Sequence, residues 1–235
     1  MAFSFRMKNP VAPAARVILT FDDGHETVYT QALPYMASAG ITGVAYIVSD
    51  WINQAGRMTP AQLLALDAAG WTIGNHTKAH GYFDTDAMTQ AQIEAALSGC
   101  NDALVDWGIA TGGLHVAYPG GQNSATSLAA MRATGMLSGR TVSALTQNNP
   151  AGVNPFGLTC NIIGYNETLQ LAKDKIDAAI AAKKCQVFGF HEIVETAANA
   201  NQWSIANFQA LIDYIEAADI QAVNIAEFYD VMVNS

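Results

Sequence analysis

The side chains best suited to chemistry in this sequence are two adjacent carboxylates near its start and histidines further along. Asp22 and Asp23 follow an apolar run and come directly before Gly24. Two neighbouring carboxylates repel each other and are costly to bury unless a cation or a proton compensates their charge. Asp-Asp-Gly also suits an ordinary surface turn. Ligand-type residues elsewhere in the chain must decide between a turn and a cation site.

Two histidines are such residues. His76 and His80 are four residues apart, and in a helical turn this spacing puts both imidazoles on one side, where they can bind one cation. A pair with no other ligand is more often a chance or surface feature. With an aspartate from another strand end, it forms the set of two histidines and one carboxylate that is typical of a catalytic divalent metal.

The elements that must position these residues follow from a recurring pattern of apolar strand, polar loop and amphipathic helix. The pattern predicts strands at 17–21, 41–48, 71–74, 114–118, 136–141, 161–163, 186–190 and 221–223, and helices at 27–39, 59–69, 89–104, 124–134, 167–183, 203–218 and 225–232. Seven or eight such units predict one α/β domain, 1–235, built as a closed or nearly closed barrel of parallel strands. The loops after the strands of such a barrel share one face, so we expect the aspartates and the strand-end histidines there.

Composition excludes several classes of protein. Hydrophobic residues make up 51% of the chain and charged residues 13%, but no run of about 20 apolar residues predicts a membrane span. The 11 Lys and Arg against 20 Asp and Glu give a net charge of −9, which argues against nucleic acid and anionic membranes as partners. The first residues lack the features of a secretory signal, and the compartment and oligomeric state stay open.

The three cysteines, Cys100, Cys160 and Cys185, follow no metal-binding or redox spacing, and their odd number excludes a complete disulfide framework. Cys160 and Cys185 could pair if their strands are neighbours. Buried free thiols are the other interpretation.

Three stretches resemble the polysaccharide deacetylase family, also called the NodB-homology domain or carbohydrate esterase family 4. They are Thr-Phe-Asp-Asp-Gly at 20–24, His-Thr-x-x-His at 76–80, and His191 after an apolar strand. The resemblance spans about 17–229 and implies a distorted (β/α) barrel. It implies removal of N-acetyl groups from amino sugars in chitin, peptidoglycan or exopolysaccharide, or of O-acetyl groups from xylan in some branches. It also suggests an extracytoplasmic or secreted protein acting on an acetylated carbohydrate.

The same resemblance implies roles for individual residues. Asp23, His76 and His80 would bind a divalent metal, for which zinc is the expected ion. Asp22 would be the general base and His191 the general acid.

Further residues are expected around the reacting groups. The backbone N–H of Gly120, after the fourth strand, would help to hold the oxyanion, with Tyr118 beside it. Phe190, with Phe188, would form an apolar pocket for the acetyl methyl group. Trp51 would either stack on a sugar ring or pack in its loop, and His25 would either reach the site or be solvated.

The sequence departs from the family pattern at three places. The motif Arg-x-Pro-Tyr reads Ala-Tyr-Pro-Gly at 117–120, so the arginine that orients the base is missing. Arg140 is either its substitute or a surface salt-bridge residue. An aspartate that tunes the acid is not identifiable, although Asn148 or Asn149 in the long loop could lie near it. Gly189 stands where leucine is usual.

These departures leave rival functions open. On the same scaffold the chain could be an O-acetyl (xylan) esterase or an allantoinase-like amidase. A catalytically silent carbohydrate-binding protein is the alternative of another class, although such a protein would need neither a base nor an acid.

Overall fold

The fold is an open, strongly curved parallel sheet with most of its helices on the outside. The computed structural model describes residues 14–83, 88–109, 113–143 and 147–234. The main sheet has the order β5-β4-β3-β2-β1-β7-β6, with β10 also bonded to β1, and all its pairings are parallel. Its strands are β1 (Arg16–Phe21), β2 (Val44–Ile47), β3 (Thr72–Asn75), β4 (His115–Ala117), β5 (Ser138–Arg140), β6 (Asn161–Ile162), β7 (Cys185–Phe190) and β10 (Gln221–Ala222).

The distortion of the barrel is visible at β1. One edge of β1 pairs with β7 along its whole length. The other edge is divided, because β10 bonds to its first residues and β2 to its last. No ladder joins β5 to β6 in the described residues, so the sheet does not close. The predicted distorted barrel of seven to eight parallel strands is confirmed.

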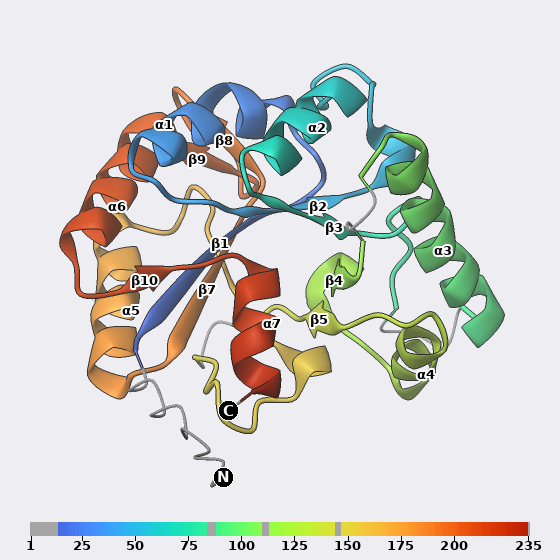
Figure 1. The fold of residues 1–235 in the computed structure, drawn as a ribbon. Coiled ribbons are helices and arrows are strands. Elements are labelled where there is room, and N and C mark those ends of the chain that lie inside the picture. Colours follow the sequence, from blue (N-terminus) through green and yellow to red (C-terminus); the bar gives the residue numbers. More distant parts are fainter. Residues whose placement is uncertain (1–13, 84–87, 110–112, 144–146, 235) are drawn as a thin grey trace, which may run out of the picture.

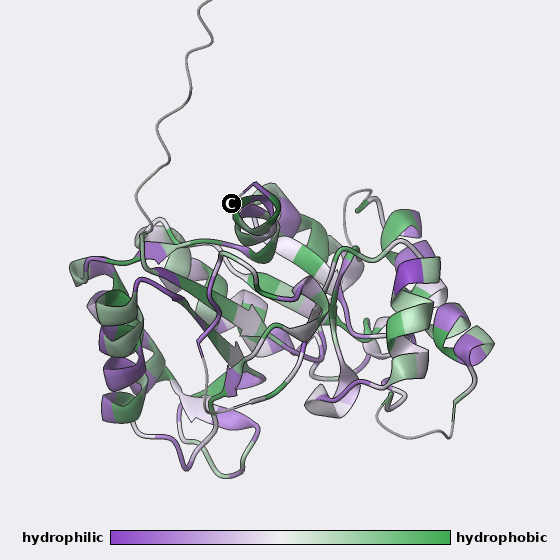
Figure 2. Ribbon diagram, turned by 90° about the horizontal axis from the view of Figure 1, so that it is seen from below, coloured by the Kyte–Doolittle hydropathy of each residue, from purple (hydrophilic) through white to green (hydrophobic). Residues whose placement is uncertain are grey.

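Helices cover both faces of the sheet unequally (Figure 1). They are α1 (Leu33–Ser38), α2 (Pro60–Ala68), α3 (Gln90–Asp106), α4 (Ala125–Ala133), α5 (Leu169–Ala182), α6 (Ile205–Ala217) and α7 (Ile225–Val233). The first six form an outer row around the sheet, whereas α7 lies on the concave side (Figure 1). The outer helices carry both hydrophobic and hydrophilic segments, as expected of helices with one face in the core (Figure 2).

The alternation of side chains along each strand divides the core into an inner and an outer part. On β1, Val17, Leu19 and Phe21 belong to the large cluster under the outer helices. Ile18 belongs instead to the inner cluster, where Phe228 of α7 also packs. The alternation continues into the first residues after each strand, so it determines which of their side chains point to the concave side.

Local sequence signals set most helix boundaries. Thr59, Thr89, Ser124 and Asn224 each cap a helix and form a capping box with the residue three positions on. A π-helical turn, η1 (Val28–Ala32), leads into α1, which has Pro34 in its first turn.

The structure departs from the predicted helix at 203–218. Trp203 lies in β9 (Gln202–Ser204), which pairs with β8 (Glu192–Val194) in a small second sheet, and α6 begins after it. These strands were not predicted, since each has three residues and no clear alternation of polarity.

Two further expectations can be compared with the fold. Among the described residues no helix is long and apolar enough to cross a membrane. Cys100, Cys160 and Cys185 are all buried free thiols. The register places Asn161, next to Cys160, opposite Phe188, so Cys160 and Cys185 lie at different heights along β6 and β7 and do not pair.

Candidate metal centre and catalytic site

The structure brings Asp23, His76 and His80 together. One ligand atom from each lies within 4.8 Å of the others. Asp23 Oδ1 is 3.6 Å from His76 Nε2 and 3.8 Å from His80 Nε2. This oxygen is buried and has no hydrogen-bond partner in the described structure.

These residues fit a divalent metal. A tetrahedral ion with bonds of about 2.1 Å requires ligand atoms roughly 3.4 Å apart, close to the separations found. An unpartnered carboxylate oxygen facing two imidazole nitrogens is the donor set that such an ion satisfies. The geometry is therefore consistent with a site for a divalent cation, without selecting zinc over other metals.

Hydrogen bonding prepares His76 for this role. Its Nδ1 lies 2.7 Å from the carbonyl oxygen of Ala117, to which it donates as the protonated ring nitrogen, leaving Nε2 as the ligand atom. Burial lowers the pKa of His76, which favours the neutral, ligating form. For Asp23, burial by itself would raise the pKa, but His25 and the other nearby histidines lower it well below its usual range.

The loop that carries the two histidines is not the predicted helical turn. Thr77 and His80 have left-handed backbone angles, with φ of +70° and +58°, and the residues between them form bends. Left-handed backbone angles are strained for a β-branched residue such as Thr77 and persist only where the surroundings enforce them. Here Asn75 enforces them: its Oδ1 accepts from Thr77 N at 2.7 Å, and its amide donates to Leu97 O in α3.

Asp22 and Asp23 diverge because the chain turns between them. Asp22 continues the alternation of β1, so its carboxylate enters the concave side. Asp23 has a φ of +71° and starts the turn through Gly24. The two adjacent carboxylates therefore have different partners.

Arg140 is the partner of Asp22. Its Nη2 donates to Asp22 Oδ2 at 2.5 Å, and both side chains are almost completely buried. The alternative that Arg140 is a surface salt-bridge residue is wrong. Burial by itself would lower the pKa of Arg140, but the Asp22 carboxylate raises it well above its usual value, so the guanidinium stays charged.

The sheet register explains how Arg140 reaches Asp22. Ala117, where the family motif has arginine, is the direct neighbour of Arg140 across the β4–β5 pair. Register partners on parallel strands point to the same face of the sheet, so both positions face the concave side. The guanidinium lies over the Tyr46 ring, with its central carbon 5.2 Å from the ring centroid.

Aromatic side chains surround His80. Trp51 stacks on its ring at a centroid distance of 5.2 Å, and Tyr82 meets it edge-on at 5.5 Å. Arg57 lies over the Trp51 ring, so Trp51 already has two partners. Tyr82 is exposed and lies against Gly120, where an added Cβ would come within 2.6 Å of its ring. Gly120 itself is exposed in the turn after β4.

Two predicted substrate contacts lie in the core instead. Phe190 is fully buried and packs against Phe21 and Trp203, because its place in the alternation of β7 directs it to the outer helices. Tyr118 is 1% exposed, donates to Phe156 O at 3.0 Å, and burial raises its pKa to about 12. Neither side chain has a surface that a substrate can touch.

His191 follows β7 at the same end of the sheet as Asp22, whose N–H donates to Phe190 O at 2.8 Å. The Nδ1 of His191 is buried and has no partner among the described residues. Asn148 does not tune it. Asn148 pairs with Cys185 at the opposite end of β7, and its side chain bonds to Thr159.

Three more residues lie near the metal-ligand candidates: His25, which the sequence placed either in the site or in solvent, and Arg57 and Glu192, to which it assigned no role. His25 Nε2 lies 3.8 Å from Asp23 Oδ2, and Arg57 donates to Asp23 O at 2.8 Å. Glu192 Oε1 lies 3.8 Å from the other ring nitrogen of His25. The position of His25 two residues after the metal-ligand candidate was the only available signal; nothing in the sequence pointed to Arg57 or Glu192.

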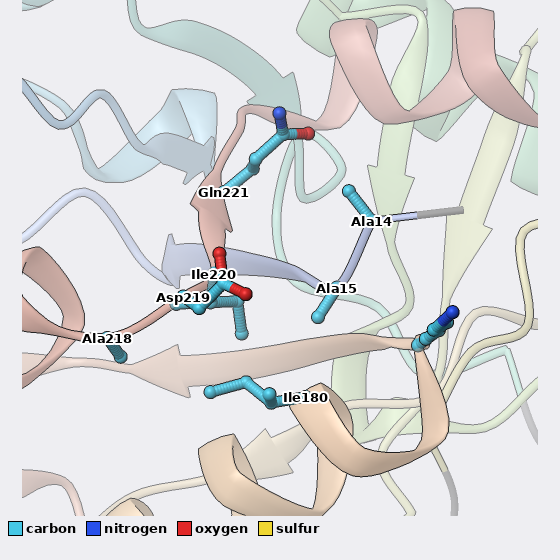
Figure 3. A pocket seen from close by; sticks show the side chains of 8 residues that line it. Ala14, Ala15, Ile180, Ala218, Asp219, Ile220 and Gln221 are labelled. Atoms are coloured by element: carbon cyan, nitrogen blue, oxygen red, sulfur yellow. The ribbon is translucent and has the colours of Figure 1, made fainter. Parts of the chain in front are cut away.

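A pocket of about 260 Å³ lies at the other end of the sheet, beside the start of β1 and β10 and the end of α5 (Figure 3). Its lining is mainly alanine and isoleucine, with Lys183, Asp219 and Gln221 as the polar residues. It is therefore separate from the metal-ligand candidates, which lie at the carboxyl ends of the strands.

Solved structures similar to this chain share its fold. A candidate polysaccharide deacetylase from Mycobacterium smegmatis matches with a TM-score of 0.75 at 11% identity, covering 97% of this chain and 93% of the other. A family 4 acetyl xylan esterase from Clostridium thermocellum, in complex with a cobalt ion, matches with a TM-score of 0.60 at 17% identity, covering 92% and 90%. A peptidoglycan deacetylase from Bacillus subtilis, solved as a mutant, matches with a TM-score of 0.60 at 14% identity, covering 95% of each chain.

No curated protein matches the chain. The family model described as polysaccharide deacetylase matches residues 10–138, which is more than half of the sequence. This match covers the two aspartates and both histidines of the candidate metal centre, although Arg140 and His191 lie beyond it. The chain belongs to the polysaccharide deacetylase family.

Proposed function

We propose that this protein is a metal-dependent hydrolase that removes N-acetyl groups from an amino-sugar polymer or oligomer. The observation that carries the proposal is the cluster of Asp23, His76 and His80 beside the buried pair of Asp22 and Arg140. A protein that only binds carbohydrate has no use for a carboxylate held by a buried arginine next to a cation site.

A divalent metal bound by Asp23, His76 and His80 would polarise the acetyl carbonyl and make a water molecule more acidic; zinc is the ion we propose. Asp22 is the proposed base that accepts the proton from this water. Arg140 occupies its Oδ2, whereas Oδ1 is without a partner in the described structure. Arg140 therefore orients the carboxylate while leaving one oxygen for proton transfer.

His191 is the proposed acid, which donates a proton to the leaving amine. It lies near enough to Asp23 to influence that carboxylate electrostatically. We propose the Gly120 N–H for the oxyanion, since Gly120 is exposed on the turn after β4. Tyr82 and Trp51 are the aromatic side chains proposed to contact the sugar.

The acetyl linkage is the finer part of the proposal. One similar structure is named as a peptidoglycan deacetylase and another as an acetyl xylan esterase, so both N-acetyl and O-acetyl carbohydrates belong in the test. The net charge of −9 favours a neutral or cationic glycan over an anionic one.

Acetate release tests the proposal. Metal-loaded protein should release acetate from chitin oligomers or acetylated peptidoglycan faster than from acetylated xylan. Asp22→Asn should keep metal and lose turnover, whereas His80→Ala should lose metal. Faster release from xylan would favour the esterase, and exclusive consumption of a cyclic ureide would favour the amidase. Binding of a glycan without turnover of any substrate would favour the alternative of a catalytically silent carbohydrate-binding protein.

A further inference from the structure

We propose that His25 is a positioning residue that holds the Asp23 carboxylate in its metal-binding orientation and links it to Glu192. This inference rests on the proposed function, because it takes Asp23 as a metal ligand. It assigns a role to His25 and Glu192, which are neither metal-ligand candidates nor the proposed base or acid.

The two oxygens of Asp23 face different groups. Oδ1 is 3.6 and 3.8 Å from the two ligand histidines. Oδ2 is 3.8 Å from His25 Nε2, on the other side of the carboxylate. If Oδ1 binds the cation, His25 is the neighbour that determines how the carboxylate is rotated.

His25 is itself held between two carboxylates. Its Nδ1 lies 3.8 Å from Glu192 Oε1, while its Nε2 faces Asp23. The side chains of His25 and Asp23 are 12% and 13% exposed, so solvent has little access to this contact, whereas Glu192 is 27% exposed. The imidazole of His25 therefore has an ion-pair contact with a different carboxylate at each of its nitrogens.

The backbone around His25 is fixed from a second loop. His25 forms an antiparallel bridge with Arg57, and Met58 N donates to Gly24 O at 2.8 Å. Gly24 has a φ of +70°, and an added Cβ would come within 2.7 Å of Ile52. The imidazole therefore starts from a constrained backbone rather than from a free surface loop.

Asp23 needs such support because its own conformation is unfavourable. A non-glycine residue with a φ of +71° is strained. Arg57 holds its backbone carbonyl at 2.8 Å, but this bond leaves the side-chain torsions free. The contact with His25 restricts them, in the way that groups next to metal ligands commonly orient the ligands themselves.

Glu192 joins this arrangement to the loop of the proposed acid. It directly follows His191, and its N–H donates to Asn201 O at 2.9 Å. The next residue, Ile193, donates to Thr27 Oγ1 at 3.2 Å, which holds β8 against the loop after β1. Glu192 is more exposed than Asp23, so we expect its removal to have a smaller effect than removal of His25.

Zinc affinity, measured by competition with a chromogenic chelator at pH 7.5, tests the proposal on the full chain. His25→Ala should bind zinc about 10- to 100-fold more weakly than the wild type. His25→Gln, whose amide can still donate to Asp23, should lose less, and Glu192→Gln should lose least. His115→Gln is the matched control, since His115 is buried beneath α7 and contacts Ser138 rather than a metal ligand.

Thermal unfolding with and without zinc separates positioning from a general loss of stability. A positioning role predicts that His25→Ala reduces the stabilisation by zinc and changes the zinc-free melting temperature little. An equal fall in both melting temperatures with unchanged zinc affinity would overturn the role of His25 alone. If the wild type binds no divalent metal, the proposed function and this inference both fail.

Discussion

The buried pair of Arg140 and Asp22 allows a quantitative test of how the base is held. We predict that replacing Arg140 by methionine, which has a similar length and no charge, strongly destabilises the fold and abolishes turnover. The side chains of Arg140 and Asp22 are 2% and 5% exposed, and Nη2 and Oδ2 are 2.5 Å apart. Asp22 would be left as a buried charge with no compensating partner.

The magnitude follows from the separation and burial of the charges. With charge centres about 4 Å apart and an effective dielectric constant of about 20, the attraction is roughly 4 kcal/mol. Removing one partner of a buried ion pair typically costs about 3–5 kcal/mol. We therefore expect Arg140→Met to lower the free energy of unfolding by about 4 kcal/mol, a large part of the roughly 5–15 kcal/mol of an ordinary domain.

A double-mutant cycle measured by urea unfolding isolates the pair. Asp22→Asn alone should also destabilise, because it leaves a buried guanidinium. The double variant, Asp22→Asn with Arg140→Met, should be more stable than the sum of the single effects by about 2–3 kcal/mol. Arg140→Lys, measured separately, keeps the charge and loses the guanidinium geometry, so it shows how much of the effect depends on that geometry.

The register between β4 and β5 supplies a rescue experiment. Ala117 is the cross-strand neighbour of Arg140 and faces the same side of the sheet. Adding Ala117→Arg to Arg140→Ala should restore part of the acetate release that Arg140→Ala loses. Additive effects in the cycle, together with full activity of Arg140→Ala, would refute the idea that Arg140 orients Asp22.

Three further predictions concern stability and metal binding. Burial lowers the pKa of His115 from 6.5 to about 4, so the unfolded chain binds a proton that the folded chain resists, and stability should fall by about 3 kcal/mol as the pH drops from about 6.5 to about 4. In unfolding experiments at several pH values, His115→Gln should reduce this loss of stability at low pH. An unchanged pH dependence would contradict its assignment to His115, whose charged neighbour is Asp230. Gly189→Ala should cost about 1–3 kcal/mol in the free energy of unfolding, because its Cβ would come within 2.6 Å of Ile162 and 2.9 Å of Cys160, and a neutral effect would show that these side chains move aside. Zinc at about 100 times its dissociation constant should stabilise the wild type by roughly 2.7 kcal/mol but should not stabilise His76→Ala; equal stabilisation of both would exclude His76 as a ligand.

Local signals in the sequence predicted the elements and the ligand set well. The helix starts at Thr59 and Thr89 follow from capping boxes, which act within four residues. The strands of the curved sheet follow from apolar runs between turn residues. Asp23, His76 and His80 could be proposed because each lies in a short motif or directly after a strand, and parallel strands bring their ends to one face.

The face on which a strand residue lies could not be predicted as well. A strand buried on both sides has no alternation of polarity, so nothing in Phe188-Gly189-Phe190 tells which residue points inward. A shift of one residue reverses every side chain. Phe190 was therefore expected beside the substrate and lies under the outer helices, whereas Gly189 faces Arg140.

By itself, the sequence determined which chemical groups are available and, through motifs and strand ends, that a carboxylate and two histidines would meet. The tertiary structure decided how those groups are held. Arg140 reaches Asp22 from 118 residues away because the β4–β5 register puts it beside Ala117. His25 reaches Asp23 because the turn at Gly24 is fixed by a second loop. Both contacts depend on strand register and on left-handed turns, which arise from long-range packing rather than from neighbouring residues.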